Sequence, residues 1–248
     1  MRDPLCQRMD ENQTAALFAD LESSDKPTIR AAVDKLVKLT ADAPTLADEL
    51  SRLLDDSRGK HRWPAAYILA HLPHPSQRVF NVLINALDHP DADIRWAVML
   101  LLVRLAKTDG EIVRLLFELR ETGTPTQRRM ALYCIRDLNL TDAASLQALL
   151  DSLRDDDPTV RVAAVTSLKG RLGIDSGGRK RLYDIFVNDP DLRVRNAAAV
   201  TLAQLGAPSG EFLAALKLAE ASEHAQLRKA ATAALSIIQK RRSAPAGG

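Results

Sequence analysis

Residues 156–168 read DDPTVRVAAVTSL, and close variants of this stretch recur along nearly the whole chain. Each variant has an arginine at the position of Arg161, and successive arginines are separated by 32, 33, 33, 33, 34 and 33 residues. These anchor arginines are Arg30, Arg62, Arg95, Arg128, Arg161, Arg195 and Arg228. A fixed period in this range is typical of proteins built from stacked repeats. The sequence therefore predicts seven copies of one structural unit.

Three positions of each copy are predicted to share one face of a helix. They lie one residue before the anchor arginine, three residues after it and seven residues after it, so each step is about one helical turn. The position three after is small or β-branched in every copy: Val33, Ala65, Val98, Ala131, Ala164, Ala198 and Ala231. The position seven after is a large aliphatic residue: Val37, Leu69, Leu102, Ile135, Leu168, Leu202 and Leu235. This face is the expected core, in which small residues let a neighbouring helix approach closely.

A turn rich in Asp and Pro precedes this helix in several copies. Examples are SSDKPT at 23–28, DHPDAD at 88–93, DDDPT at 155–159 and NDPD at 188–191. Asp and Ser cap the first amides of a helix, and Pro is tolerated in its first turn. Another apolar-periodic segment comes before the turn, such as VLINAL at 82–87. One unit is therefore a helix, a turn and a second helix, and the predicted fold class is all-α.

These units resemble HEAT repeats, in the short form common in bacterial and archaeal proteins and in phycobilin-lyase-like chains. The resemblance covers about residues 10–241 and rests on Asp-Pro-x-Val-Arg followed by an Ala-rich helix. It implies an α-solenoid of about seven two-helix repeats in a right-handed superhelix. It also implies a ladder of turn aspartates and helix arginines between adjacent repeats, expected here at Asp156, Asp157 and Arg161. The motifs of ankyrin and tetratricopeptide repeats are missing from the sequence.

Composition agrees with one helical solenoid. Hydrophobic residues make up 46% of the 248 residues and charged residues 27%, a balance that can bury a continuous core. We expect a loose arm over 1–9, a single solenoid over 10–241 and a disordered tail over 242–248.

The same numbers limit the partners and the compartment. The formal net charge is only +2, which argues against wholesale nucleic-acid binding. The longest apolar run, 96–103, is far shorter than a membrane span, and the polar start of the chain does not resemble a signal peptide. Cys6 and Cys134 are too few for a disulfide framework, so a reduced, cytoplasmic setting is expected. Cys134 is expected to face the core.

Aromatic residues cluster on the predicted outward side of the second helices. The positions one, five, eight and twelve after the anchor arginine point away from the core stripe. In the second to fourth copies these are Trp63, Tyr67, Ala70 and His74, then Trp96, Leu100, Val103 and Lys107, then Arg129, Tyr133, Arg136 and Leu140. Both tryptophans and two of the three tyrosines of the chain therefore fall on one stripe.

The family resemblance implies that second helices line the concave side, so this stripe would form an aromatic groove edged by cations. Aromatic residues and Arg dominate binding hot spots, and exposed apolar patches mark interaction sites. The predicted partner-binding residues are Trp63, Tyr67, Trp96, Leu100, Lys107, Arg129, Tyr133 and Arg136. The alternative is that superhelical twist turns these positions inward, where they pack against neighbouring repeats.

A second candidate site lies in the sequence GIDSGGRKR at 173–181. Arg179, Lys180 and Arg181 stand at the start of a predicted helix, where cations oppose the helix dipole. An anion or an acidic partner could therefore bind to these side chains and to the preceding glycines. The alternative is a flexible loop with a solvated basic turn.

Enzymes with this repeat provide tests for catalysis. Deoxyhypusine hydroxylase holds its irons with His-Glu pairs, whereas here no histidine is followed by Glu. His71 and His74 lack nearby carboxylate or Cys ligands, so no metal site is expected. Alkylpurine DNA glycosylases use aromatics, an Asp and many cations, and Arg104 and Asp137 lie near the stripe, but the low net charge argues against this activity. No catalytic residue, cofactor or chromophore site is identified.

The sequence favours a non-catalytic, monomeric adaptor that binds a peptide or helix of another protein. A nucleic-acid-binding protein and a phycobilin-lyase-like or chaperone-like protein are the alternatives. No membrane partner is expected.

Overall fold

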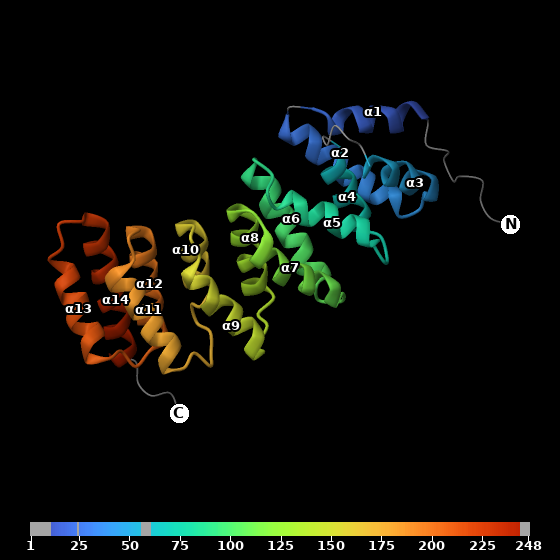
Figure 1. Cartoon of the computed structure of the whole chain (residues 1–248). Helices are drawn as coiled ribbons and strands as arrows, with labels where there is room; N and C mark the ends of the chain where they lie inside the picture. The colour runs from blue at the N-terminus through green and yellow to red at the C-terminus, as the bar shows by residue number, and fades with distance from the viewer. Residues whose placement is uncertain (1–10, 24, 56–60, 244–248) are drawn as a thin grey trace. The chain divides into compact units, whose positions relative to one another are not determined.

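The computed structural model describes residues 11–23, 25–55 and 61–243, and within these ranges it contains helices and no strand (Figure 1). The helices are α1 (Glu11–Leu21), α2 (Lys26–Thr40), α3 (Pro44–Leu53), α4 (Arg62–Leu69), α5 (Gln77–Ala86), α6 (Ala92–Leu105), α7 (Gly110–Thr122), α8 (Pro125–Asp137), α9 (Ala143–Asp151), η1 (Ser152–Arg154), α10 (Pro158–Ser167), α11 (Ser176–Asn188), α12 (Leu192–Leu205), α13 (Gly210–Glu220) and α14 (Ala225–Ser243). Odd-numbered α-helices are called A helices here, and even-numbered ones B helices. Each consecutive A and B helix forms one repeat, which confirms the predicted α-solenoid of seven two-helix units.

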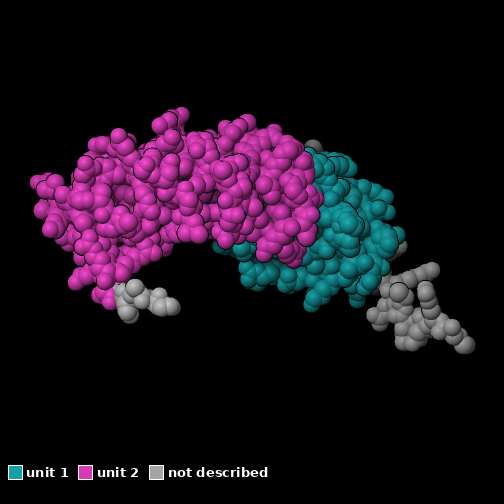
Figure 2. Space-filling view, turned by 90° about the horizontal axis from the view of Figure 1, so that it is seen from below, with its two compact units in different colours: residues 1–102 teal, residues 103–248 magenta. Residues whose placement is uncertain are grey.

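The chain divides into two compact units, residues 1–102 and residues 103–248, which Figure 2 colours separately. Unit 1 contains α1 to α5 and most of α6, and unit 2 contains the end of α6 and α7 to α14. The predictions of a single solenoid over 10–241 and of a right-handed superhelix stay predictions. The predicted arm, 1–9, lies outside the described residues. Helix α14 includes Arg242 and Ser243, the first two residues of the predicted tail.

The predicted core face is confirmed at its central position. The residue three after the anchor arginine is buried in every repeat. The residue seven after it is buried in five repeats and half-buried at Val37 and Leu235. These residues occupy one side of each B helix, as the helical spacing requires. The core therefore follows the B helices from repeat to repeat within each unit.

The residue one before the anchor arginine is aliphatic in five repeats, and in the other two it is His61 or Gln127. Both of these residues have polar partners. His61 Nε2 lies 2.7 Å from Glu22 Oε1, so the ring joins α4 to the end of α1. Gln127 accepts a hydrogen bond from Thr124 N at 3.0 Å, and Thr124 Oγ1 accepts one from Gln127 N at 3.2 Å. This reciprocal pair is a capping box at the start of α8.

The acidic turns are explained by helix capping. The side chains of six aspartates accept hydrogen bonds from amides in the first turn of the following helix, which otherwise lack acceptors. They are Asp25, Asp109, Asp142, Asp157, Asp175 and Asp191. The carboxylate also complements the positive end of the helix dipole. Aspartate side chains therefore cap the first turns of six of the described α-helices.

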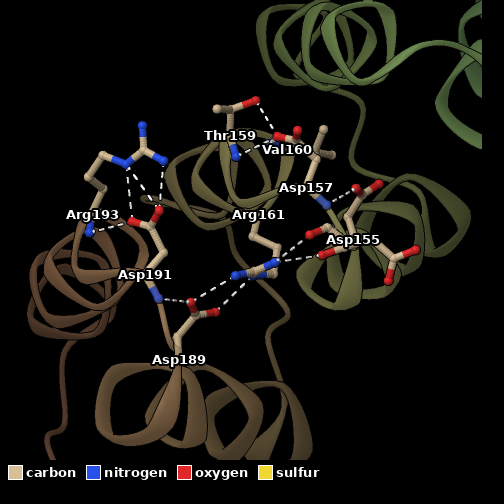
Figure 3. Close-up of polar contacts among 9 residues, drawn as sticks. Asp155, Asp157, Thr159, Val160, Arg161, Asp189, Asp191 and Arg193 are labelled. Atoms are coloured by element: carbon tan, nitrogen blue, oxygen red, sulfur yellow. Dashed lines mark hydrogen bonds and ion pairs between the residues drawn. The ribbon is translucent and has the colours of Figure 1, made fainter.

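A ladder of arginines and aspartates links adjacent repeats in unit 2 (Figure 3). Arg161 Nε and Nη2 donate to the two carboxylate oxygens of Asp189 at 2.8 and 2.9 Å. Arg161 Nη1 donates to the carbonyls of Asp155 and Asp156, at 2.9 and 3.1 Å, in the turn before its own helix. One guanidinium therefore joins the turn that starts α10 to the turn that starts α12.

The same contact occurs one repeat earlier. Arg128 Nε and Nη2 donate to the Asp155 carboxylate at 2.8 and 2.7 Å, and Arg128 Nη1 donates to Gly123 O at 2.9 Å. Since Asp155 O also accepts from Arg161, the polar chain is continuous from Arg128 to Asp189.

The ladder carboxylates differ from the predicted ones. Asp157 is the N-cap of α10 and accepts from Thr159 N at 2.7 Å, and Asp156 contributes only its carbonyl. The carboxylate that meets the preceding arginine stands two residues before the N-cap, at Asp155 and Asp189. The prediction of Asp156 and Asp157 was therefore wrong, because the N-cap carboxylate turns toward its own helix.

In unit 1, Lys26 links the repeat that contains α2 to the repeat that contains α6. Lys26 Nζ in α2 lies 2.8 Å from Asp91 and 2.6 Å from Asp93, in the turn that starts α6 and just inside that helix. Arg95 Nη1 donates to Pro90 O at 2.9 Å in the same turn, as Arg161 does in unit 2. The lysine contact is largely exposed, so solvent screens it more than the ladder.

We expect Arg161→Ala to lower the free energy of unfolding by about 3 kcal/mol, because the Asp189 carboxylate, 5% exposed, would lose its charged partner. Urea unfolding followed by far-UV circular dichroism measures the change. Arg114→Ala is the matched control, since Arg114 pairs with Glu111 at an exposed site on α7 and should leave the midpoint almost unchanged. Equal losses in the two variants would contradict the ladder's role.

Stability should also fall in acid through Asp191. Its carboxylate accepts from the Arg193 side chain and backbone, which lowers the pKa of Asp191 to about 2 from its ordinary 3.8. This contribution is present above the ordinary pKa and is lost as pH falls from about 3.8 to about 2. Asp191→Asn keeps a capping side chain but removes the charge. The variant should therefore lose less stability than wild type over this range in urea unfolding; identical pH profiles would contradict this assignment.

Candidate functional site

The exposed apolar part of the predicted stripe lies on α6 in unit 1. Trp96 is 41% exposed and Leu100 is 60% exposed. They are four residues apart on one helix, so their side chains lie on the same side of it. We call Trp96 and Leu100 the α6 patch. It presents two large apolar side chains to solvent, one of them an indole.

Trp63 and Tyr67 on α4 are half-buried and contact other side chains. The Trp63 ring meets the ring of His89 edge-on, with centroids 5.9 Å apart. The Tyr67 ring lies 5.2 Å from that of His71, whose Nδ1 is 2.8 Å from Tyr67 O. The stripe residues of α4 therefore pack against neighbouring side chains, as the alternative predicted, whereas those of α6 are exposed.

His89 positions Trp63 from the turn before α6. Its Nδ1 accepts a hydrogen bond from Asp91 N at 3.0 Å. Burial lowers the pKa of His89 below its ordinary value, so the ring is neutral at pH 7. A neutral ring with a fixed tautomer gives the indole a stable surface to pack against.

In unit 2 the predicted residues on α8 are all half-buried: Arg129, Tyr133 and Arg136. The Arg136 guanidinium lies 4.9 Å from the centre of the Tyr133 ring, and its Nε donates to Asp137 Oδ1 at 2.6 Å. Arg129 Nε is buried and has no hydrogen-bond partner among the described residues. Lys107, after the end of α6, is exposed. The structure thus joins Tyr133 to Arg136, and the groove that would include α6 and α8 stays a prediction.

Two residues of the predicted outward stripe are in the core. Ala70 and Val103 stand eight positions after their anchor arginines and are buried. That position lies at the margin of the outward face, and the apolar stripe of a packed helix is wide enough to include it. The outward face of these B helices is therefore narrower than the spacing predicted.

The basic turn of α11 has internal partners. The Asp175 side chain caps the helix and accepts from Gly178 N at 2.7 Å. Arg179 donates to Gly206 O at 2.9 Å and to Leu205 O at 3.1 Å, at the C-terminal end of α12. Among the three predicted anion-binding residues, Lys180 is exposed and Arg181 is half-buried. Arg179 is therefore engaged in holding α11 against α12, and anion binding here stays a prediction.

A hollow on the B helices of unit 2 was missed by the sequence analysis. It has a volume of about 480 Å³ and is lined from α10, α12, α14 and the residue Lys169. Its lining includes outward positions of three successive repeats: Thr166, Lys169, Asn196, Val200, Lys229 and Ala233. We call it the α12 hollow. The sequence feature that could have indicated this hollow is the series of short side chains at several of these outward positions.

Charge is segregated in unit 2. Its B helices α8, α10, α12 and α14 contain eleven Lys and Arg residues and a single carboxylate, Asp137. The other carboxylates of unit 2 lie in A helices and turns, including the ladder residues Asp155 and Asp189. These B helices are therefore positively charged, although Arg128, Arg161 and Arg193 pair with aspartates of the turns.

The Cys134 thiol and the possible metal-binding side chains lie outside these surfaces. Cys134 is buried, as predicted, and burial raises the pKa of its thiol far above the ordinary value, so it stays protonated. Within the described ranges, no three His, Cys, Asp or Glu side chains are grouped so as to hold a metal ion. None of the helices described here is long and apolar enough to cross a membrane.

A family model described as HEAT repeats matches residues 80–169 and 112–203. The chain belongs to the HEAT-repeat family. A HEAT repeat-containing taxis protein of Halobacterium salinarum is 29% identical over 148 residues, which cover 53% of this chain and 36% of that protein. The chain thus spans about a third of this curated HEAT relative.

Two solved structures are similar to this chain at low identity, and the first of them shares the helical-repeat fold. The X-ray structure of the Escherichia coli protein YibA is 16% identical with a TM-score of 0.55, and the match covers 97% of this chain and 99% of that one. The phycocyanin lyase complex of CpcE and CpcF from Nostoc is 21% identical with a TM-score of 0.38, covering 97% and 98%. The first likeness concerns the fold alone, and the second supports no argument about activity.

We expect the two tryptophans to differ in solvent access. Trp96→Phe leaves only Trp63, which packs on His89, and Trp63→Phe leaves only the exposed Trp96. Acrylamide should quench Trp96 more strongly, and its emission should lie further to the red. Both variants should keep the far-UV circular dichroism of the wild type. Equal quenching of the two indoles would contradict the exposure of the α6 patch.

Proposed function

We propose that this HEAT-repeat protein is a non-catalytic scaffold that binds another protein on the outward faces of its B helices. The observation that carries this proposal is the α6 patch, in which Trp96 and Leu100 are both exposed. Burying a leucine side chain on a partner is worth about 1.5–3 kcal/mol, and tryptophan is enriched at interface hot spots. The partner would offer an apolar side chain or a short amphipathic helix to this patch.

The other predicted binding residues would act around this apolar centre. Lys107 is exposed, and the Arg136 guanidinium is held by Asp137 and the Tyr133 ring, so it is ordered before a partner arrives. Ordered cations at the rim of an interface favour partners with acidic groups and speed their association. Trp63 and Tyr67 would contribute mainly by supporting α4, because they are half-buried.

The non-catalytic part of the proposal is supported by how the candidate reactive groups are used. The Cys134 thiol is buried and protonated. His61 pairs with Glu22, and His89 accepts from Asp91 N. These groups serve the fold, which leaves binding as the activity best supported by the exposed surfaces. The taxis protein among the relatives makes taxis the first cellular process in which to seek a partner.

Affinity capture from lysate of the source organism tests the scaffold. Wild type is compared with Trp96→Ser/Leu100→Ser, which removes the α6 patch. The matched control is Leu172→Ser/Leu218→Ser, because these leucines are 93% and 76% exposed elsewhere in the chain. A partner should bind the patch variant at least about tenfold more weakly and should bind the control as it binds wild type.

Two results would contradict the proposal. A partner that binds both variants as well as wild type would place the contact away from α6. Capture of nucleic acid alone, abolished by nuclease, would favour the nucleic-acid-binding alternative. Circular dichroism of each variant confirms that helices are retained.

A further inference from the structure

The α12 hollow exists because the outward positions around α12 have short side chains. Val200 on α12 and Ala233 on α14 stand where Leu100 and Tyr133 stand in earlier repeats. Helix α12 contacts α10 and α14 on its two sides, so the three helices form one continuous surface within unit 2. Short side chains on neighbouring helices leave about 480 Å³ open to solvent. A chain segment can approach the helices closely there.

The hollow is cationic and contains no carboxylate in its lining. Lys169 follows α10 and Lys229 lies in α14, so the two ammonium groups come from opposite sides of α12. Both lysines are exposed, and neither pairs with a carboxylate of the described chain. The B helices of unit 2 contain a single carboxylate, that of Asp137, which is paired with Arg136. A carboxylate that enters the hollow would meet two cations and no like charge.

The lining favours a polypeptide over a nucleic acid. Its apolar part consists of small aliphatic groups such as Ala197, Val200 and Ala230, and no aromatic ring lines it. Single-stranded nucleic acids are held by stacking on aromatic side chains, and duplexes need many phosphate contacts. Asn196, which also lines the hollow, has a buried Oδ1 without a hydrogen-bond partner among the described residues.

We infer that the α12 hollow binds an acidic segment of a partner protein, with carboxylates at Lys169 and Lys229 and short apolar side chains against α12. This inference rests on the proposed scaffold function and adds the chemistry of the partner. It also assigns a role to repeats that the aromatic stripe does not reach. The α6 patch and the α12 hollow belong to different units and can be tested separately.

The test uses purified full-length protein and a short fluorescein-labelled peptide in which Glu alternates with Ala. Fluorescence anisotropy measures its affinity for wild type, for Lys169→Glu/Lys229→Glu and for Lys35→Glu/Lys217→Glu. The second variant is the matched control, because Lys35 and Lys217 are exposed lysines outside the lining of the hollow and the change in net charge is the same. We expect the hollow variant to bind at least about tenfold more weakly and the control to change less than about twofold.

Two probes complete the design. The same peptide with Lys in place of Glu should not bind, and a single-stranded oligonucleotide of equal charge should bind more weakly than the Glu peptide. No binding of the Glu peptide, equal losses in the two variants, or tighter binding of the oligonucleotide would each overturn the inference. A loss confined to the control variant would also overturn it.

The α6 variant separates this inference from the proposed function. Trp96→Ser/Leu100→Ser should bind the Glu peptide as wild type does. If the peptide fails to bind while the α6 variant still loses its captured partner, the scaffold proposal stands and the α12 inference fails. If the peptide binds as expected but the α6 variant keeps its captured partner, the contact proposed at α6 is wrong and the hollow remains.

Discussion

The contact between the Arg161 guanidinium and the Asp189 carboxylate links two adjacent repeats of unit 2. The aspartate is nearly buried, so the pair is less screened by water than an ordinary surface pair. The third nitrogen of the same guanidinium holds two carbonyls of the preceding turn. Helix packing between repeats brings apolar faces together, but these directional bonds determine how one turn is aligned with the next.

This alignment explains how binding surfaces arise from a repetitive fold. In unit 2, α12 contacts both α10 and α14, and outward positions of these three B helices line one hollow. Large residues at those positions produce the α6 patch, and short ones produce the α12 hollow. The carboxylates needed for capping and for the ladder are in the turns, which leaves the B helices of unit 2 cationic. The use of aspartates in the turns for capping and for the ladder thus accompanies a positive charge on the B helices of unit 2.

Much of the fold could be predicted because it is periodic. Alanine or valine three residues after each anchor arginine indicated the buried face, and every such residue is buried. The ladder carboxylate was missed because Asp155, Asp156 and Asp157 are consecutive, and composition does not say which one faces the preceding arginine. The equivalent residues His89 and Ser222 accept hydrogen bonds from the amide two residues ahead, as Asp155 does, so aligning the turns would have identified the position.

The site was less predictable, because Trp63 and Trp96 occupy the same position in their repeats. Their exposure distinguishes them, because Trp63 is half-buried and Trp96 is 41% exposed. The α12 hollow forms because the side chains that line it are mostly short, and no sequence motif indicates such a hollow.

The ladder also has a consequence for how such a chain can change in length. Each rung takes its arginine from one repeat and its carboxylate from the next, so a whole-repeat duplication between Arg128 and Asp189 would supply both halves of a new rung. A duplication that began or ended within a repeat would leave one half unmatched. Ser222 replaces the aspartate in the last turn, so Arg195 has no such carboxylate and instead donates to Phe186 O. Whole repeats can therefore be added within this part of the ladder without leaving an arginine or an aspartate unpaired.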